Sequence, residues 1–152
     1  MKEELNDEVN HPDWYTADPS GVECINVVSV LPNDLGCAVK YVWRHGRKWN
    51  ELQDLRKAQW YLEHAMKSGV TAAGLSALVA THCALIGSSF RQWSTTVSSV
   101  RDSWDGRDDD TMSGFFDSLR FLDVEGMRYH VNMLIGECEA KEDGDADASK
   151  GE

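Results

Sequence analysis

The 152-residue sequence lacks the features that would place it among membrane or secreted proteins. It has no run of eighteen or more apolar residues, the minimum expected of a single helix that crosses a bilayer. Its first eight residues carry no apolar segment of the kind that forms the core of a signal peptide. We therefore expect a cytoplasmic protein without a membrane partner.

Several recurring catalytic and metal-binding motifs are also missing. There is no Gly-x-x-x-x-Gly-Lys-[Ser/Thr] loop for a triphosphate, no Gly-x-Ser-x-Gly elbow and no dinucleotide fingerprint. The four cysteines form no Cys-x-x-Cys pair and have no histidine at ligand spacing, which argues against zinc and favours buried thiols: Cys24, Cys37, Cys83 and Cys138. If this chain transfers phosphate, we expect it to use side-chain cations, with or without Mg²⁺, outside the usual kinase architecture.

Positive charge is scarce overall but concentrated in one stretch. The chain has a formal net charge of −11, and both ends are acidic, with one Lys against seven acids in residues 1–23 and two Lys against seven acids in residues 137–152. Residues 36–67 reverse this balance with seven Lys or Arg against three acids, a local net charge of +4. A cationic surface on an acidic protein favours a compact anion, because the surrounding negative field repels long polyanions such as duplex nucleic acid.

The apolar spacing predicts an all-α protein, a small helical bundle with disordered acidic ends. Residues 21–31 form the weakest helix prediction, because Val27, Val28 and Val30 would also suit a strand. The remaining helices are predicted from capping residues and from 3.6-residue periodicity. Their expected ranges are 33–45, 50–66, 71–90, 93–104, 110–122 and 124–137.

This pattern suggests four segments within one domain. Residues 1–8 are an acidic N-terminal segment, residues 9–69 a first helical region and residues 70–137 a second one. Residues 138–152 form an acidic tail whose last twelve residues have no large apolar side chain, so disorder is expected there. The small-residue helix 71–90, together with six Trp and four Phe, offers more apolar surface than one small bundle hides, which predicts at least a dimer.

Four cations lie close together in the predicted second helix and just after it. Lys40, Arg44 and Arg47 are spaced i, i+4 and i+7, which places them on one stripe, and Lys48 follows the turn at Gly46. Guanidinium groups bind phosphate oxygens bidentately, and lysine adds a point charge. The stripe is thus a candidate phosphate site, although a solvated helix face paired with acids is an equally simple interpretation.

A second stripe at the start of the next helix contains Glu51, Asp54, Lys57 and Tyr61. Its two acids could place a Mg²⁺ ion, orient a ribose hydroxyl or form ion pairs with the arginines. We assign them an orienting or metal-placing role, with Lys57 beside them, and leave these alternatives open.

A series of spaced motifs between Val9 and Lys67 carries a further signal. The matched positions are His11, Tyr15, Gly21, Glu23, Gly36, Lys40, Tyr41, Arg44, Gly46, Lys48, Glu51, Asp54, Leu55, Lys57, Ala58, Trp60 and Tyr61. Their order resembles the small phage nucleotide kinases and their relatives with a SaV-like domain. The sequence departs from that pattern at Cys37, where Asn is usual, and at Asp13-Trp14, which lengthen the first loop.

The resemblance implies a phage-encoded nucleotide-binding protein in the cytoplasm of an infected host cell. By this resemblance it would phosphorylate deoxynucleoside monophosphates from a nucleoside triphosphate, with Mg²⁺ as a possible cofactor and with no catalytic acid or base identified. The cations would hold phosphates, while His11, Tyr15 and Glu23 would close over the nucleoside. Two alternatives remain: a non-catalytic protein that sequesters a nucleotide, acting against host defence signalling, and an interaction protein that binds a host protein.

Overall fold

The fold is all-α, as the sequence predicted. The computed structural model describes residues 18–45 and 50–150, and within these ranges it contains seven helices and no strand. They are α3 (Cys24–Val28), α4 (Asn33–Arg44), α5 (Glu51–Lys67), α6 (Ala72–Leu85), α7 (Phe90–Asp105), α8 (Asp110–Arg120) and α9 (Val124–Lys150).

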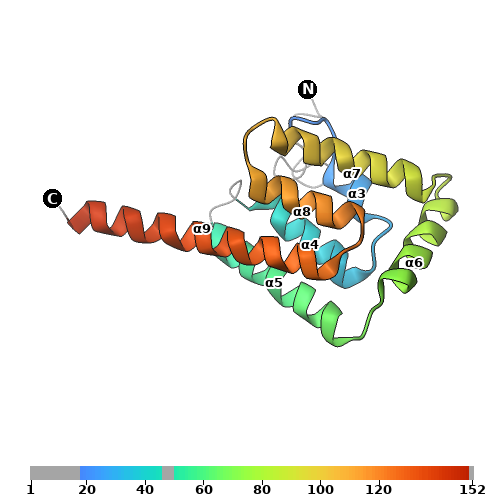
Figure 1. Ribbon diagram of the computed structural model, residues 1–152, viewed down its shortest axis with the longest axis horizontal. Helices are drawn as coiled ribbons and strands as arrows, with labels where there is room; N and C mark the ends of the chain where they lie inside the picture. The colour runs from blue at the N-terminus through green and yellow to red at the C-terminus, as the bar shows by residue number, and fades with distance from the viewer. Residues whose placement is uncertain (1–17, 46–49, 151–152) are drawn as a thin grey trace, which may run out of the picture.

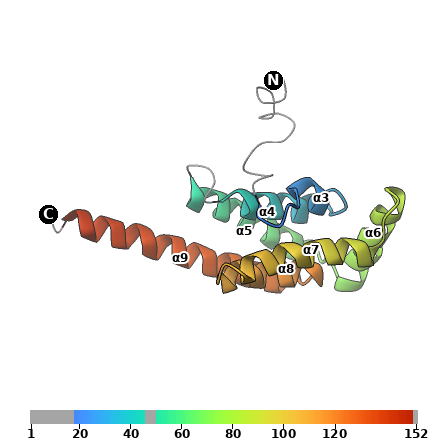
Figure 2. The ribbon, with the colours of Figure 1, turned by 90° about the horizontal axis from the view of Figure 1, so that it is seen from above.

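The helices form a closed bundle with α6 at one end. α4 packs on α5, α5 on α9, α9 on α8 and α8 on α7, and the short α3 contacts both α4 and α7. Figures 1 and 2 show α6 as an outer edge that connects the far ends of α5 and α7. The two halves of the sequence therefore build one common core, because the long-range contacts join α5 to α9 and α3 to α7.

The core is centred on aromatic and leucine side chains from both halves. Trp43 of α4 meets Phe116 of α8 edge to face at 5.5 Å between ring centroids, and Phe115 meets Phe116 in the same way at 5.2 Å. Such edge-to-face pairs add specific geometry to the apolar area that they bury. They fix α4, which carries the candidate cations Lys40 and Arg44, against the C-terminal helices.

Local signals explain where most helices begin and end. Asn50 caps α5 by accepting a hydrogen bond from the Gln53 backbone N–H, as the sequence suggested. The segment 21–31 contains the short helix α3 and no strand, which settles the weakest prediction in favour of a helix. The helix expected over 71–90 ends earlier, at Leu85, because Gly87 adopts a left-handed conformation with φ of 75°.

The last helix is longer than expected. The sequence predicted that this helix ends at Glu137, whereas α9 continues to Lys150. Cys138 is buried and Arg56 of α5 donates to Glu139 at 2.9 Å, so the packed part of α9 extends past the expected end. Residues 139–145 are exposed, and Figures 1 and 2 show this end of α9 projecting from the bundle.

Three of the four cysteines are buried, in agreement with their interpretation as structural thiols: Cys24, Cys83 and Cys138. Burial raises the pKa of the Cys83 and Cys138 thiols, so both stay protonated at neutral pH. Among the described residues, no single helix is long and apolar enough to cross a membrane, and only α5 and α6 taken together, bent by 110°, reach that length and composition.

Candidate functional site

Three of the predicted site residues, Arg44, Asp54 and Lys57, lie along the line where α4 and α5 face each other. The contacts pair residues in opposite order along the two helices, so α4 and α5 run antiparallel. We call this line the α4–α5 seam and define it by eight residues: Asp34, Cys37, Tyr41 and Arg44 on α4, and Asp54, Lys57, Tyr61 and His64 on α5. Each set has the spacing i, i+3, i+7 and i+10, which keeps its members on one helix face.

Arg44 and Asp54 form the most buried charged contact of the seam. Nε of Arg44 lies 3.1 Å from Oδ2 of Asp54 and Nη2 lies 2.9 Å from Oδ1, a bidentate arrangement. The Asp54 side chain is only 3% exposed and that of Arg44 is 21% exposed. Because a buried carboxylate needs strong donors, this pair fixes the plane of the guanidinium group.

Tyr41 brings two cations from different helices together. The Arg44 guanidinium carbon lies 4.9 Å from the centre of the Tyr41 ring, and Nζ of Lys57 lies 5.3 Å from it. Tyr61 stacks beside Tyr41 at 6.1 Å between centroids. Cations are attracted to the electron-rich face of an aromatic ring, so the half-buried Tyr41 is contacted by positive charges from both helices.

The middle of the seam contains a thiol and a phenol. The neighbouring Cys37 raises the pKa of Tyr61, with smaller contributions from burial and from Tyr41. Tyr61 therefore remains a protonated phenol over the physiological range and can donate a hydrogen bond. Cys37 is half-buried, and it occupies the position where the resembling family usually has Asn.

At the opposite end of the seam, Asp34 contacts His64, and His64 stacks on Trp60. Nδ1 of His64 lies 2.7 Å from Oδ2 of Asp34, and the His64 ring stacks on the Trp60 indole with 5.2 Å between centroids. Tyr61 meets the same indole edge to face at 5.0 Å. Trp60 is nevertheless 58% exposed, so its ring has a fixed plane and an open surface.

The two predicted acids differ in what they contact. Asp54 directs both carboxylate oxygens at Arg44, whereas Glu51 is half-buried with its Oε1 3.9 Å from Nε2 of His45. Within the described residues, no group of three or more His, Cys, Asp or Glu side chains is arranged to hold a metal ion. Because both oxygens of Asp54 contact Arg44, Asp54 and Glu51 do not form a Mg²⁺ site in this arrangement.

The structure separates the remaining predicted residues. Lys40 is exposed on α4, one turn before Arg44. Glu23 begins α3, where it forms a reciprocal capping box with Asn26, and its predicted part in covering a nucleoside stays a prediction. Four of the predicted positions lie outside the described residues: His11, Tyr15, Arg47 and Lys48.

A surface depression beside the seam was not predicted from the sequence. It has a volume of about 550 Å³ and is lined by Asn50, Leu52, Gln53, Arg56, Lys57, Trp60 and Glu142. The stripe i, i+3, i+7, i+10 formed by Asn50, Gln53, Lys57 and Trp60 was visible in the sequence. The sequence did not indicate that Glu142 lines the same depression, because this residue lies far along the chain, near the end of α9.

Comparison with known protein families matches part of this chain. Residues 9–63 match DUF3310, a protein family of unknown function. The matched part includes α3, α4 and most of α5, and therefore seven of the eight seam residues. Searches of the curated proteins and of the solved structures found no match to this chain.

Proposed function

We propose that this chain is a phage nucleotide-binding protein that transfers a phosphoryl group from a nucleoside triphosphate to a deoxynucleoside monophosphate. The observation that carries the proposal is the cation cluster on Tyr41, where Arg44 and Lys57 contact one ring at 4.9 and 5.3 Å from its centre. Asp54 supplies one negative charge beside Arg44, and a phosphate that binds at the ring would neutralise the remaining positive charge.

Charge distribution supports a compact ligand. The cluster lies within residues 36–67, which carry a net charge of +4 in a chain of net charge −11. A mononucleotide can bind at such a surface without approaching the acidic remainder of the protein. Duplex nucleic acid and membrane surfaces would meet that acidic field over a larger area, and we do not propose them as partners.

Phosphoryl transfer depends mainly on positioning of the phosphates and on neutralisation of their charge, and the seam residues can provide both. Asp54 fixes the orientation of Arg44, so the guanidinium group does not have to be ordered when a phosphate binds. Lys40 and Lys57 add mobile positive charge, and Arg47 and Lys48 follow in the sequence. We propose these cations as the phosphate ligands, and no side chain is assigned as general acid or base.

A thermal-shift screen followed by a turnover assay tests the proposal. Purified protein is heated with each deoxynucleoside monophosphate, each nucleoside triphosphate and their pairs with Mg²⁺. A ligand at a hundred times its Kd should stabilise the folded chain by about 2.7 kcal/mol. Formation of a deoxynucleoside diphosphate, followed by chromatography, would support the kinase. If no nucleotide raises the melting temperature, the proposal is wrong.

A non-catalytic nucleotide-sequestering protein is the second candidate, and the geometry of Asp54 favours it specifically. Both oxygens of this acid contact Arg44, so it serves to orient a cation rather than to place a metal. A protein that only binds needs the cations and no metal-placing acid. Tight binding without product in the turnover assay would support this second function, for which a host signalling nucleotide is the proposed ligand.

The third candidate is an interaction protein whose acidic ends and helical face dock on a host protein. Self-association is a separate proposal, and it rests on the surface of α6. Residues 68–90 contain no Asp, Glu, Lys or Arg, and α6 leaves apolar side chains exposed, with Leu85 at 78% and Leu78 at 38%. An uncharged helix is the place where two copies of a chain of net charge −11 can approach with least repulsion. We therefore propose that α6 pairs with α6 of a second copy.

We expect Leu85→Glu to convert a dimer into a monomer at tens of micromolar protein, because the new carboxylate would lose water at the interface. Leu85 is largely exposed, so the fold of each copy should persist. Light scattering after size-exclusion chromatography measures the mass. Ala140→Glu adds the same charge on the exposed part of α9 and should leave the dimer intact. A monomeric wild-type protein at this concentration would contradict the α6 pairing.

A further inference from the structure

Trp60 combines exposure with a fixed orientation. An exposed indole normally has freedom about two side-chain torsions, but here His64 stacks on it and Tyr61 meets its edge. Asp34 in turn holds His64 at 2.7 Å. An aromatic ring whose plane is already set loses little conformational entropy when a second flat group stacks on it.

The depression in front of Trp60 has walls of mixed polarity. Asn50 and Gln53 contribute amide groups, Leu52 an apolar surface and Glu142 a carboxylate. Amides can donate and accept hydrogen bonds, and a carboxylate accepts them from hydroxyl or amino groups. These are the groups that recognise the edge of a base and the hydroxyls of a sugar. Two cations also line the depression: Arg56, which pairs with Glu139, and Lys57, whose Nζ faces the Tyr41 ring.

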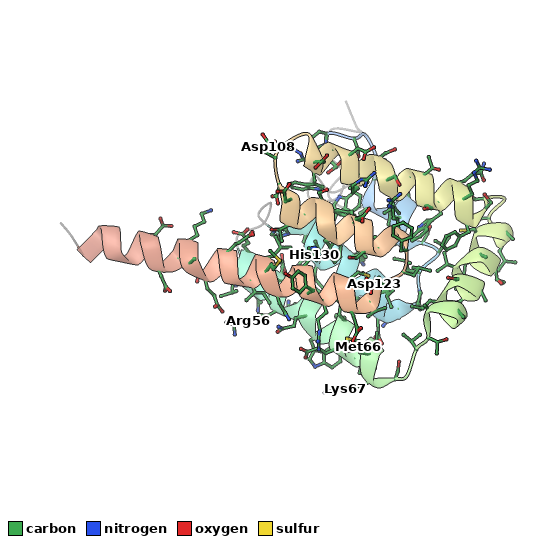
Figure 3. All side chains as sticks on the ribbon, viewed as in Figure 1. Arg56, Met66, Lys67, Asp108, Asp123 and His130 are labelled. Atoms are coloured by element: carbon green, nitrogen blue, oxygen red, sulfur yellow. The ribbon has the colours of Figure 1, made fainter. Side chains whose placement is uncertain are left out.

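An exposed ion pair joins α5 to the wall formed by α9. Nη2 of Arg56 donates to Oε1 of Glu139 at 2.9 Å, and Glu142 follows one helical turn later. Figure 3 labels Arg56, which extends from α5 beside α9. The projecting part of α9 thus has a specific role at this surface, because without it the depression would be open on that side.

Lys57 connects the depression to the cation cluster. It lines the depression with Trp60, and its Nζ lies 5.3 Å from the centre of the Tyr41 ring that also contacts Arg44. A ligand with its phosphate near Arg44 and Lys57 would therefore extend its remaining part along α5 toward Trp60.

We propose that the depression binds the base of the nucleotide, with Trp60 as the stacking surface. This inference rests on the proposed nucleotide-binding function and adds the position and the orientation of the base. Stacking on an aromatic face is available to every base, so Trp60 contributes affinity, while Asn50, Gln53 and Glu142 discriminate between bases by their edges.

Isothermal titration calorimetry of the full chain tests the base site. The ligands are the four deoxynucleoside monophosphates and deoxyribose 5-phosphate, which lacks a base. Trp60→Ala should weaken the monophosphates about 5- to 100-fold and leave deoxyribose 5-phosphate within about twofold of its wild-type affinity. Trp60→Phe should restore most of the loss, because a phenyl ring also stacks. Tyr129→Ala removes an aromatic ring that is 61% exposed on α9 and should change neither ligand.

Fluorescence gives a second readout. A base that stacks on an indole quenches its emission, so nucleotide should quench wild-type protein and should quench Trp60→Phe much less, although this variant still binds. The base site is overturned if Trp60→Ala weakens the monophosphates and deoxyribose 5-phosphate equally, or if it changes the affinity of neither. The phosphate site is tested separately, by the variant Arg44→Lys. If wild-type protein binds no nucleotide at all, the proposed function fails and the base site fails with it.

Discussion

Arg44→Lys is expected to weaken nucleotide binding about ten- to a hundredfold, corresponding to a charged hydrogen-bonded contact of about 1.5–3 kcal/mol. The lysine keeps the positive charge but loses the planar fork that Asp54 orients through Nε and Nη2. Titration calorimetry with the nucleotide found in the thermal-shift screen measures the change.

The same substitution should also lower the free energy of unfolding, by about 1 kcal/mol. Asp54 is 2% exposed, and a lysine ammonium satisfies one of its oxygens less completely than a bidentate guanidinium satisfies both. Arg101→Lys is the matched control, because Arg101 donates to Asp102 and Asp117 on the α7–α8 surface, away from the seam. It should leave nucleotide affinity unchanged.

The two measurements separate the interpretations of Arg44. Weaker binding together with a modest loss of stability supports a phosphate-binding arginine that Asp54 holds in place. Unaltered binding with a clear loss of stability means that Arg44 serves the fold alone, in which case the assignment of the cation cluster is wrong. The interaction protein would then become the leading candidate.

Phe116→Ala should destabilise the protein by about 3–5 kcal/mol, a large part of the 5–15 kcal/mol that is typical of whole domains. Phe116 is 1% exposed and contacts both Trp43 and Phe115, so its removal leaves a cavity between α4 and α8. Urea denaturation followed by circular dichroism measures the free energy of unfolding.

This variant also tests what residues 70–137 contribute to the seam. Because Trp43 precedes Arg44 directly, a loosened Trp43 should allow α4 to shift and should reduce nucleotide affinity under conditions where the variant is still folded. Phe121→Ala is the matched control on the same part of the chain, since Phe121 is 63% exposed. We expect it to change stability by less than about 1 kcal/mol. If Phe116→Ala and Phe121→Ala lower the free energy of unfolding by similar amounts, burial of Phe116 against Trp43 is not the cause of the destabilisation.

The amino-acid sequence by itself determined the fold class and the location of the charged residues. Helix positions followed from apolar spacing and from caps such as Asn50, which are interactions between residues a few positions apart. The start of α8 shows the limit of this reasoning. The sequence predicted a helix that begins at residue 110, and in the structure Asp109 is the residue that caps it. Residues 108–110 are all aspartates, so the sequence alone does not tell which of the three carboxylates accepts the capping hydrogen bond.

Only the tertiary structure decided which charges pair and which surfaces stay open. Glu51 and Asp54 were equivalent in sequence, but the antiparallel packing of α4 on α5 buries Asp54 against Arg44 and leaves Glu51 half-buried near His45. Trp60 and Glu142 meet at one depression although they come from different halves of the chain. Helix formation is governed by neighbours along the chain, whereas the loss of water from a charge depends on elements that are far apart in sequence. For this reason the residues could be named from the sequence, and their roles in the seam could not.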